Sequence, residues 1–343
     1  MLDDLQFIHQ RDSQDALGVA NKEWQQLQYD FQSDWHPSGS IDAVIVTGMG
    51  GSALAATVAQ TWLNPKVPYE VVRNYNLPDY ASHQALVVAS SYSGNTEETL
   101  SALSDAEDRG CQIVIVASGG ELADIAQQKQ YPLFRLPTGL QPRMAVFYNL
   151  AALTKLFVLA NICQVERIAE LHAAGEWLRD QSAKWYVDVP AGTNTAKSIA
   201  QELIGKSIVI YSGPKLYPAA YKWKISFNES AKHIAWVNQL PEFNHNEMLG
   251  WTKQPVDKPY AVIDLRSSLE HDRVQKRFMV TEQLLSGMRP EPIVVPVAGE
   301  TILEQLVWAI TLGDFVSLYT ALLGNIDPTP VDLIEKFKKT LAQ

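Results

Sequence analysis

The stretch that decides the fold is Leu86-Val-Val-Ala-Ser-Ser-Tyr-Ser-Gly-Asn-Thr-Glu-Glu-Thr-Leu100. Its apolar start predicts a buried β-strand, and the run from Glu97 predicts a helix. Between them lies a short turn around Gly94 whose hydroxyl groups come from Ser90, Ser91, Ser93 and Thr96. We therefore expect a strand, a tight turn and a helix N-terminus here.

This turn has the chemistry of a phosphate site. A helix N-terminus gathers unpaired N–H groups and a partial positive charge, which together favour an anion. The turn lacks the lysine of a P-loop, so a sugar phosphate held by hydroxyls and amides fits better than a triphosphate with Mg²⁺. An ordinary turn with Asn95 or Thr96 as helix cap explains the same residues, and this stretch alone leaves both interpretations open.

Composition excludes several classes of protein. A length of 343 residues favours two domains, and 46% hydrophobic with 19% charged residues is typical of a soluble globular protein. The net charge of −10 argues against nucleic-acid binding, which needs a basic surface. A local phosphate site remains compatible with that charge.

Targeting and membrane signals are weak. Only Cys111 and Cys163 are present, so we expect neither a disulfide framework nor a cysteine metal motif. The N-terminal residues lack the basic and apolar regions of a signal peptide. The apolar segment 302–324 is interrupted by polar residues, so we expect a buried helix and no membrane span. These features predict a cytoplasmic protein.

A second strand–turn–helix unit precedes the first. Ala43-Val-Ile-Val46 predicts a strand, followed by Thr47-Gly-Met-Gly-Gly-Ser52 and a helix over 53–62. The glycines do not complete the G-x-G-x-x-G dinucleotide motif, because Ala53 stands where the last glycine is expected; a G-x-G-x-x-A variant exists, so a dinucleotide-binding interpretation stays open. Against it, the next strand, 69–73, does not end in an acidic residue. Further strands at 112–117 and 131–136 alternate with helices, which predicts a parallel sheet covered on both faces.

The pattern then repeats. Gly213 lies 163 residues after Gly50, and Gln239-Leu-Pro-Glu-Phe243 follows Asn76-Leu-Pro-Asp-Tyr80 at the same offset. The sequence therefore predicts an internal duplication of one α/β unit. We expect N-terminal helices plus the first copy over 1–160, a helical connector over 161–195 and the second copy over 196–343.

The two copies are unequal. The second replaces the small turn residues with Pro214-Lys215 and Asp264-Leu-Arg266, so we assign phosphate recognition to the first copy. The second copy instead carries the polar clusters Phe227-Asn-Glu-Ser-Ala-Lys232 and Asn244-His-Asn-Glu247.

These motifs resemble a known family. Gly48-Met-Gly-Gly-Ser52 with Ser90–Thr99 resembles the sugar isomerase (SIS) domain. The tandem arrangement, with Pro142-Arg143, Asn228-Glu229 and Asn244–Glu247, resembles the bifunctional phosphoglucose/phosphomannose isomerase family over about residues 40–340. The resemblance implies two tandem SIS domains, each a flavodoxin-like, three-layer αβα sandwich with a mostly parallel sheet.

The resemblance also implies an activity. Such enzymes interconvert glucose 6-phosphate, and often mannose 6-phosphate, with fructose 6-phosphate through a cis-enediol, in glycolysis and gluconeogenesis. They are homodimers and use neither a metal nor another cofactor. The positions that match the 6-phosphate site are Gly50, Gly51, Ser52, Ser91, Ser93 and Thr96.

Four further positions match the family's catalytic groups. Glu229 matches the base that moves a proton between C1 and C2, and Arg143 the cation that steadies the enediolate. His245 matches the group that opens the sugar ring, contributed by the neighbouring subunit. Lys338 matches a lysine near the ring oxygen, and Thr329 is a candidate for the threonine linked to epimer tolerance.

Each of these residues also has a structural interpretation. Asn228-Glu229 fits a helix cap, His245 a surface loop, and Lys338 the solvated face of a C-terminal helix. Arg143 fits a helix start fixed by Pro142.

Two other functions compete with the isomerase. A non-catalytic sugar-phosphate sensor usually carries a helix-turn-helix, for which residues 1–40 have neither the length nor the basic charge. An amidotransferase would need a glutaminase domain with an N-terminal cysteine. The use of mannose 6-phosphate stays open.

Overall fold

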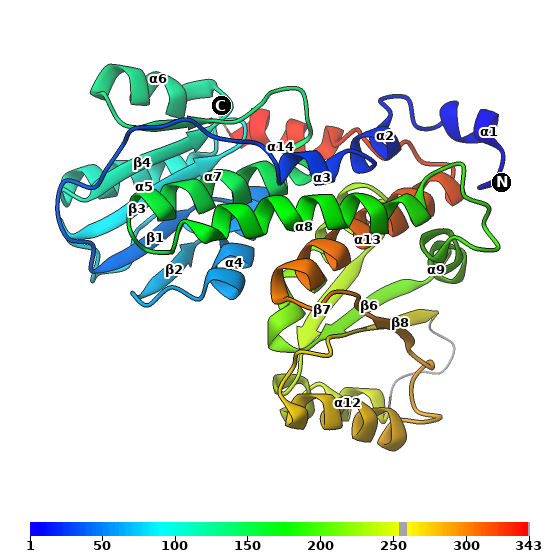
Figure 1. The fold of residues 1–343 in the computed structure, drawn as a ribbon. Helices are drawn as coiled ribbons and strands as arrows, with labels where there is room; N and C mark the ends of the chain where they lie inside the picture. The colour runs from blue at the N-terminus through cyan, green and yellow to red at the C-terminus, as the bar shows by residue number, and fades with distance from the viewer. Residues whose placement is uncertain (254–258, 342–343) are drawn as a thin grey trace. The chain divides into compact units, whose positions relative to one another are not determined.

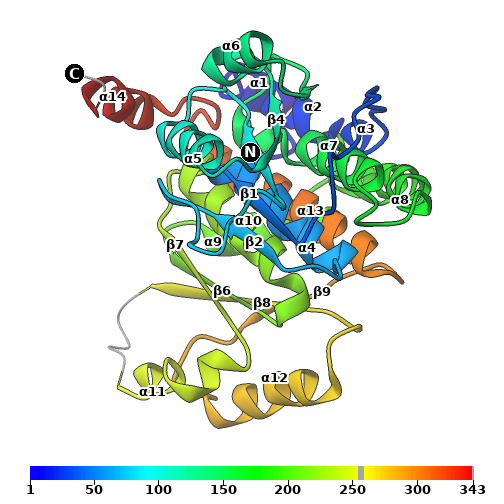
Figure 2. The same cartoon turned by 90° about the vertical axis from the view of Figure 1, so that its left-hand side faces the viewer.

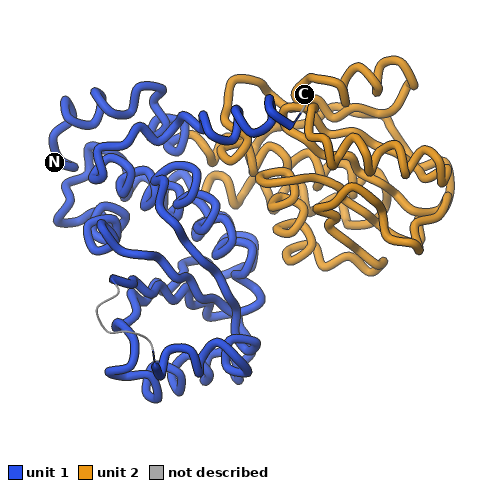
Figure 3. Tube along the Cα trace, turned by 180° about the vertical axis from the view of Figure 1, so that it is seen from behind, with its two compact units in different colours: residues 1–21, 178–343 blue, residues 22–177 orange. Residues whose placement is uncertain are grey.

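The computed structural model describes residues 1–253 and 259–341. These residues form two compact units, one of residues 22–177 and one of residues 1–21 with 178–343 (Figure 3). Each unit contains one sheet (Figure 1). We describe each unit by itself.

The first unit, residues 22–177, is built on a five-stranded parallel sheet. The strands are β1 (Ala43–Thr47), β2 (Tyr69–Val72), β3 (Ala85–Ser91), β4 (Gln112–Ala117) and β5 (Leu133–Arg135), in the order β2-β1-β3-β4-β5. Every residue of β1 and β3 is buried, as expected where helices cover both faces of a parallel sheet. This strand order is the flavodoxin-like one.

Helices cover both faces of this first sheet. On one face α4 (Gly50–Leu63) lies against β1, β2 and β3 and packs along α7 (Val146–Leu159), which also contacts α3 (Glu23–Gln26). On the other face α5 (Glu97–Asp108) and α6 (Gly120–Lys129) pack on β3 and β4 around buried side chains such as Val87, Ile115 and Leu103. The division between the units falls inside α8 (Glu166–Ser182).

The second sheet repeats the first with one strand fewer. Its strands are β6 (Ser207–Ser212), β7 (Ala235–Gln239), β8 (Tyr260–Arg266) and β9 (Ile293–Pro296), all parallel, in the order β7-β6-β8-β9. This order matches β2-β1-β3-β4 of the first sheet. The predicted fold class, two tandem αβα units with parallel sheets, is therefore confirmed.

Two layers of helices cover the second sheet. α10 (Tyr217–Glu229) lies against β6 and β7 and packs on α13 (Ile302–Leu323), which also contacts α9 (Thr195–Leu203). On the opposite face lie α11 (Met248–Trp251) and α12 (Asp272–Leu284) (Figure 2). By length and composition alone α13 could cross a membrane, but 89% of its most apolar window is buried inside the protein. It is the core helix that its sequence predicts.

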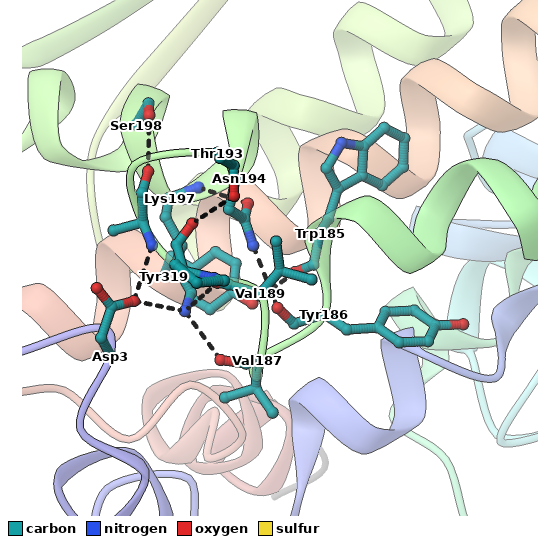
Figure 4. Close-up of polar contacts among 12 residues, drawn as sticks. Asp3, Trp185, Tyr186, Val187, Val189, Thr193, Asn194, Lys197, Ser198 and Tyr319 are labelled. Atoms are coloured by element: carbon teal, nitrogen blue, oxygen red, sulfur yellow. Dashed lines mark hydrogen bonds and ion pairs between the residues drawn. The ribbon is translucent and has the colours of Figure 1, made fainter.

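The N-terminal residues group with the second sheet. Lys197 on α9 is fully buried, and its Nζ donates to the carbonyl oxygens of Val187 and Val189 at 2.8 Å each (Figure 4). Lys197 Nζ also donates to Asp3 Oδ1 at 3.1 Å. Asp3 precedes the two short helices α1 (Leu5–His9) and α2 (Ala16–Ala20). Residues 1–21 thus lie in this unit, whereas the sequence led us to place them with the first copy. The domain ranges 1–160, 161–195 and 196–343 remain a prediction.

Candidate functional site

The predicted phosphate site lies at the switch point of the first sheet. β1 and β3 are neighbours, and β2 and β4 extend the sheet on opposite sides of them. Ligands of such sheets bind beyond the carboxyl ends of the strands at this point. The segments that leave β1 and β3 there are residues 48–49, which lead into α4, and residues 92–96, which lead into α5.

Three predicted hydroxyl groups meet in the turn after β3. Ser91 Oγ lies 2.7 Å from Thr96 Oγ1 and 3.5 Å from Ser93 Oγ. Ser91 Oγ accepts from the backbone N–H of Gly94 at 3.1 Å. We call Ser91, Ser93 and Thr96 the hydroxyl cradle.

Neither predicted cap residue caps α5 with its side chain. Thr96 occupies the N-cap position, but its side chain makes no capping hydrogen bond. Asn95 Oδ1 accepts instead from the backbone N–H of Glu121, at the start of α6 (2.9 Å). The simple helix-cap interpretation therefore does not explain the hydroxyls.

Glycines allow two close contacts between segments of this unit. Gly94 has φ +74°, and a Cβ there would lie 1.8 Å from the carbonyl oxygen of Gly119. A Cβ on Gly51 would lie 2.5 Å from the carbonyl oxygen of Pro142 and 3.6 Å from Cα of Arg143. The first turn of α4, with Gly50 and the buried Ser52, therefore packs against the 3₁₀ helix η1 (Pro142–Met144) that carries the buried Arg143.

The structure adds two residues that the sequence analysis missed. Ser90 Oγ donates to Asn149 Oδ1 at 3.2 Å, so a buried amide of α7 fixes the end of β3. Tyr92 Oη donates to the carbonyl of Pro137 and accepts from the N–H of Leu140, which anchors the loop that leads to Arg143. A polar Asn inside the otherwise apolar α7 segment could have indicated the contact between Asn149 and Ser90.

The corresponding point of the second sheet is filled by the chain itself. Glu270 Oε1 accepts from the backbone N–H of Lys215 at 2.7 Å, and a Cβ on Gly213 would lie 2.3 Å from the same oxygen. Burial raises the pKa of the Glu270 carboxyl, which the contact with Lys215 partly offsets. A side-chain carboxylate thus lies at the turn that would correspond to the phosphate site.

Glu229 is the last residue of α10 and is half-buried. Earlier turns of this helix carry Lys222 and Ser226, which are buried with Asp314 of α13. Lys222 Nζ is ion-paired with Asp314 Oδ1 and donates to Ser226 Oγ at 2.8 Å, while Ser226 Oγ donates to Asp314 Oδ1 at 2.6 Å. This cluster joins α10 to α13, and the sequence pattern alone does not indicate it.

His245 is the exposed last residue of the 3₁₀ helix η4 (Glu242–His245). Glu229 precedes the amino end of β7, whereas His245 follows its carboxyl end. A five-residue strand spans about 16 Å at ~3.3 Å per residue. One chain therefore does not bring Glu229 and His245 to the same point.

Lys338 lies on α14 (Asp332–Leu341), where its Nζ is 3.0 Å from Glu335 Oε1 and both side chains are more than half exposed. This geometry is that of a solvated helix face. Thr329 is buried, and its N–H donates to Asp327 Oδ1 at 3.0 Å. Within residues 1–253 and 259–341, no group of three or more His, Cys, Asp or Glu could hold a metal ion.

Comparisons with known proteins identify the family of this chain. Residues 192–341 match the family model of the bacterial phospho-glucose isomerase C-terminal SIS domain. The chain is 35% identical over 313 residues to a bifunctional phosphoglucose/phosphomannose isomerase of Caldicellulosiruptor bescii, covering 88% of this chain and 90% of the relative. It is 31% identical over 301 residues to the enzyme of that name from Aquifex aeolicus, covering 87% and 90%.

A solved structure shows the same fold. A glucose-6-phosphate isomerase-like protein from Thermus thermophilus superposes with a TM-score of 0.63 at 17% identity, and the match covers 98% of each chain. At this identity the likeness concerns the fold alone, whereas the sequence relatives establish the family. The chain belongs to the bifunctional phosphoglucose/phosphomannose isomerase family.

Proposed function

We propose that this protein interconverts glucose 6-phosphate with fructose 6-phosphate through a cis-enediol intermediate, with mannose 6-phosphate as a second aldose substrate. The observation that carries the proposal is the hydroxyl cradle at the switch point of the first sheet, together with the packing of the first turn of α4 against the segment that bears Arg143. Family membership supports the same reaction class. The reaction belongs to cytoplasmic sugar metabolism, in glycolysis or gluconeogenesis.

Different residues act at the two ends of the substrate. The hydroxyl cradle, Ser52 and the amides of Gly50 and Gly51 hold the 6-phosphate. Glu229 removes the proton from C2 and returns it to C1, while the Arg143 cation stabilises the negative charge on the enediolate oxygen. His245 exchanges the hydroxyl protons that open the ring, and Lys338 is assigned, as in the family, to the ring oxygen.

We further propose a homodimer in which His245 serves the neighbouring subunit's site. Glu229 and His245 lie at opposite ends of β7, so two groups that must both reach one sugar fit better as contributions of two chains. α14 also exposes an apolar face with Leu333 80%, Phe337 63% and Leu341 53% accessible. Such a contiguous apolar face favours burial against a partner chain.

The decisive test is Glu229→Gln. It should lower kcat for glucose 6-phosphate by about 10³-fold, since the proton-transfer group is lost, while phosphosugar binding measured by calorimetry stays nearly unchanged. Glu202→Gln, on an exposed position of α9, is the matched control and should retain activity. Wild-type turnover should need no added metal and resist a chelator.

The competing function is a sugar-phosphate sensor. It predicts that wild-type protein binds glucose 6-phosphate but does not exchange its C2 proton with deuterated solvent. Detectable exchange in the wild type that disappears in Glu229→Gln would exclude this alternative. Coupled assays with glucose 6-phosphate and mannose 6-phosphate decide whether both aldoses are substrates.

A further inference from the structure

We propose that Glu247 is a positioning residue that fixes His245 for ring opening, an inference that rests on the function proposed above. His245 lies in a connection that follows β7, over residues 240–251, which we call the His245 loop. His245 and Asn246 are exposed, whereas residues on both sides of them are held by the body of the unit.

Glu247 links this loop to the sheet through both of its carboxylate oxygens. Its Oε1 accepts from the hydroxyl of Tyr211 on β6, and its Oε2 accepts from Nδ2 of Asn238 on β7 at 2.6 Å. Tyr211 and Asn238 are register partners on neighbouring strands, so one carboxylate spans two strands of the sheet. A carboxylate held by two donors has little freedom to change its rotamer.

Tyr211 is itself rigid and remains a donor. It is 1% exposed, and its Oη also accepts from Nε1 of Trp251 at 2.9 Å, which ties down the end of the loop. Burial, followed by the nearby Glu247 carboxylate, raises the pKa of the Tyr211 phenol, so it stays protonated at neutral pH.

The other side of His245 is anchored independently. Phe243 is fully buried, with its ring 4.5 Å from that of Tyr211. Asn244 donates to Thr281 Oγ1 of α12 at 2.8 Å and accepts from Nη1 of Arg277 at 3.2 Å. His245 is thus fixed by an apolar anchor before it and by the Glu247 carboxylate two residues after it.

This arrangement has a catalytic consequence. A flexible two-residue segment would place an exposed imidazole at many positions, and a displacement of about 1 Å can cost up to ~10²-fold in rate. Because both carboxylate oxygens of Glu247 already accept from Tyr211 and Asn238, we expect Glu247 to remove this freedom without contacting the sugar. Its effect on the reaction must therefore pass through His245.

The test uses anomerisation of glucose 6-phosphate, which needs ring opening but no proton transfer at C2. Exchange NMR measures it, and kcat and KM for isomerisation are measured in parallel. Glu247→Ala should slow anomerisation about 10- to 100-fold and lower kcat with little change in KM, since the phosphate end is untouched. Glu247→Gln, which keeps one acceptor oxygen, should lose less. Glu282→Gln, a carboxylate bonded to Arg266 of the same unit, is the matched control and should behave as wild type.

A double-mutant cycle separates positioning from a general loss of structure. The pair His245→Gln with Glu247→Ala should be no slower than His245→Gln alone, because the carboxylate acts through the imidazole. Additive losses would overturn the proposal, as would wild-type anomerisation in Glu247→Ala.

Hydrogen exchange keeps the inference testable apart from the proposed reaction. Amides of the His245 loop should exchange at least about tenfold faster in Glu247→Ala, while those of β6 and β8 keep wild-type protection. Unchanged exchange in the loop contradicts the positioning role even if activity falls. A wild type that neither isomerises nor anomerises hexose phosphates would instead refute the proposed function.

Discussion

Ser91 lies at the centre of the hydroxyl cradle, with Thr96 Oγ1 at 2.7 Å and the N–H of Gly94 at 3.1 Å. A hydrogen bond to a charged group contributes about 1.5–3 kcal/mol, which corresponds to roughly a 10- to 100-fold change in affinity. We therefore expect Ser91→Ala to raise KM for fructose 6-phosphate by that factor with a much smaller change in kcat. Ser104→Ala, at an exposed position of α5, is the control. A fall in kcat at constant KM would show that Ser91 does not bind the phosphate.

The residues of the candidate site differ in how far sequence could identify them. Ser91, Ser93 and Thr96 lie within one turn, so their proximity followed from local spacing and the structure shows it. The Ser90–Asn149 contact joins positions 59 residues apart, and the contact of Glu270 with Lys215 joins positions 55 apart. Such pairs depend on how helices dock on the sheet, which the sequence pattern does not specify.

The packing of α10 on α13 places Glu229, and a buried ion pair controls it. Lys222 and Asp314 are 1% and 2% exposed, so removing one partner leaves an uncompensated charge in the core. We expect Lys222→Met to lower the free energy of unfolding by about 3–5 kcal/mol in urea titrations. The double variant Lys222→Met/Asp314→Leu should recover most of this loss, because no buried charge remains.

A less buried lysine of the same helix supplies the control. Lys224→Met, at a half-buried position of α10, should change the free energy of unfolding by less than about 1 kcal/mol. If Lys222→Met is as mild as Lys224→Met, the buried pair does not hold α10 in place.

At the scale of elements, the sequence was largely sufficient to predict the strands and helices. The apolar run at Gln112–Ala117 is a strand with the predicted ends, and the helix expected from Glu97 begins at that residue and ends at Asp108. Both copies have clear strand–turn–helix periodicity because a parallel sheet buries both faces of its strands. The short helices η4 and α11 were not predicted, since four-residue elements depend on anchors such as Phe243 and Trp251 rather than on periodicity.

At the scale of the molecule, the sequence predicted the duplication but not the unit to which the N-terminal segment belongs. The repeat of Asn76–Tyr80 as Gln239–Phe243 predicted two related sheets, and the strand orders agree with it. Residues 1–21 belong to the second sheet's unit through contacts such as Arg11 with Asn325 and Ser13 with Asp327. These contacts join positions 314 residues apart, and nothing in local sequence indicates them.

Sharing of His245 between subunits can be tested by complementation. Glu229→Gln and His245→Gln should each be nearly inactive alone. If His245 serves the neighbouring chain, both defects of a mixed dimer fall on one site and its other site is intact. Random mixing of equal amounts then gives half mixed dimers, so about a quarter of all sites regain wild-type activity.

Whether activity returns depends on which chain's site His245 serves. If it acts on its own chain's Glu229, every site in the mixture keeps one defect and activity does not return. The measurement is coupled-assay activity after the two variants are unfolded together and refolded, with a mixture of Glu229→Gln and wild type as the control for exchange. Recovery toward a quarter would mean that the catalytic unit is the dimer, with the length of β7 separating the two groups within each chain.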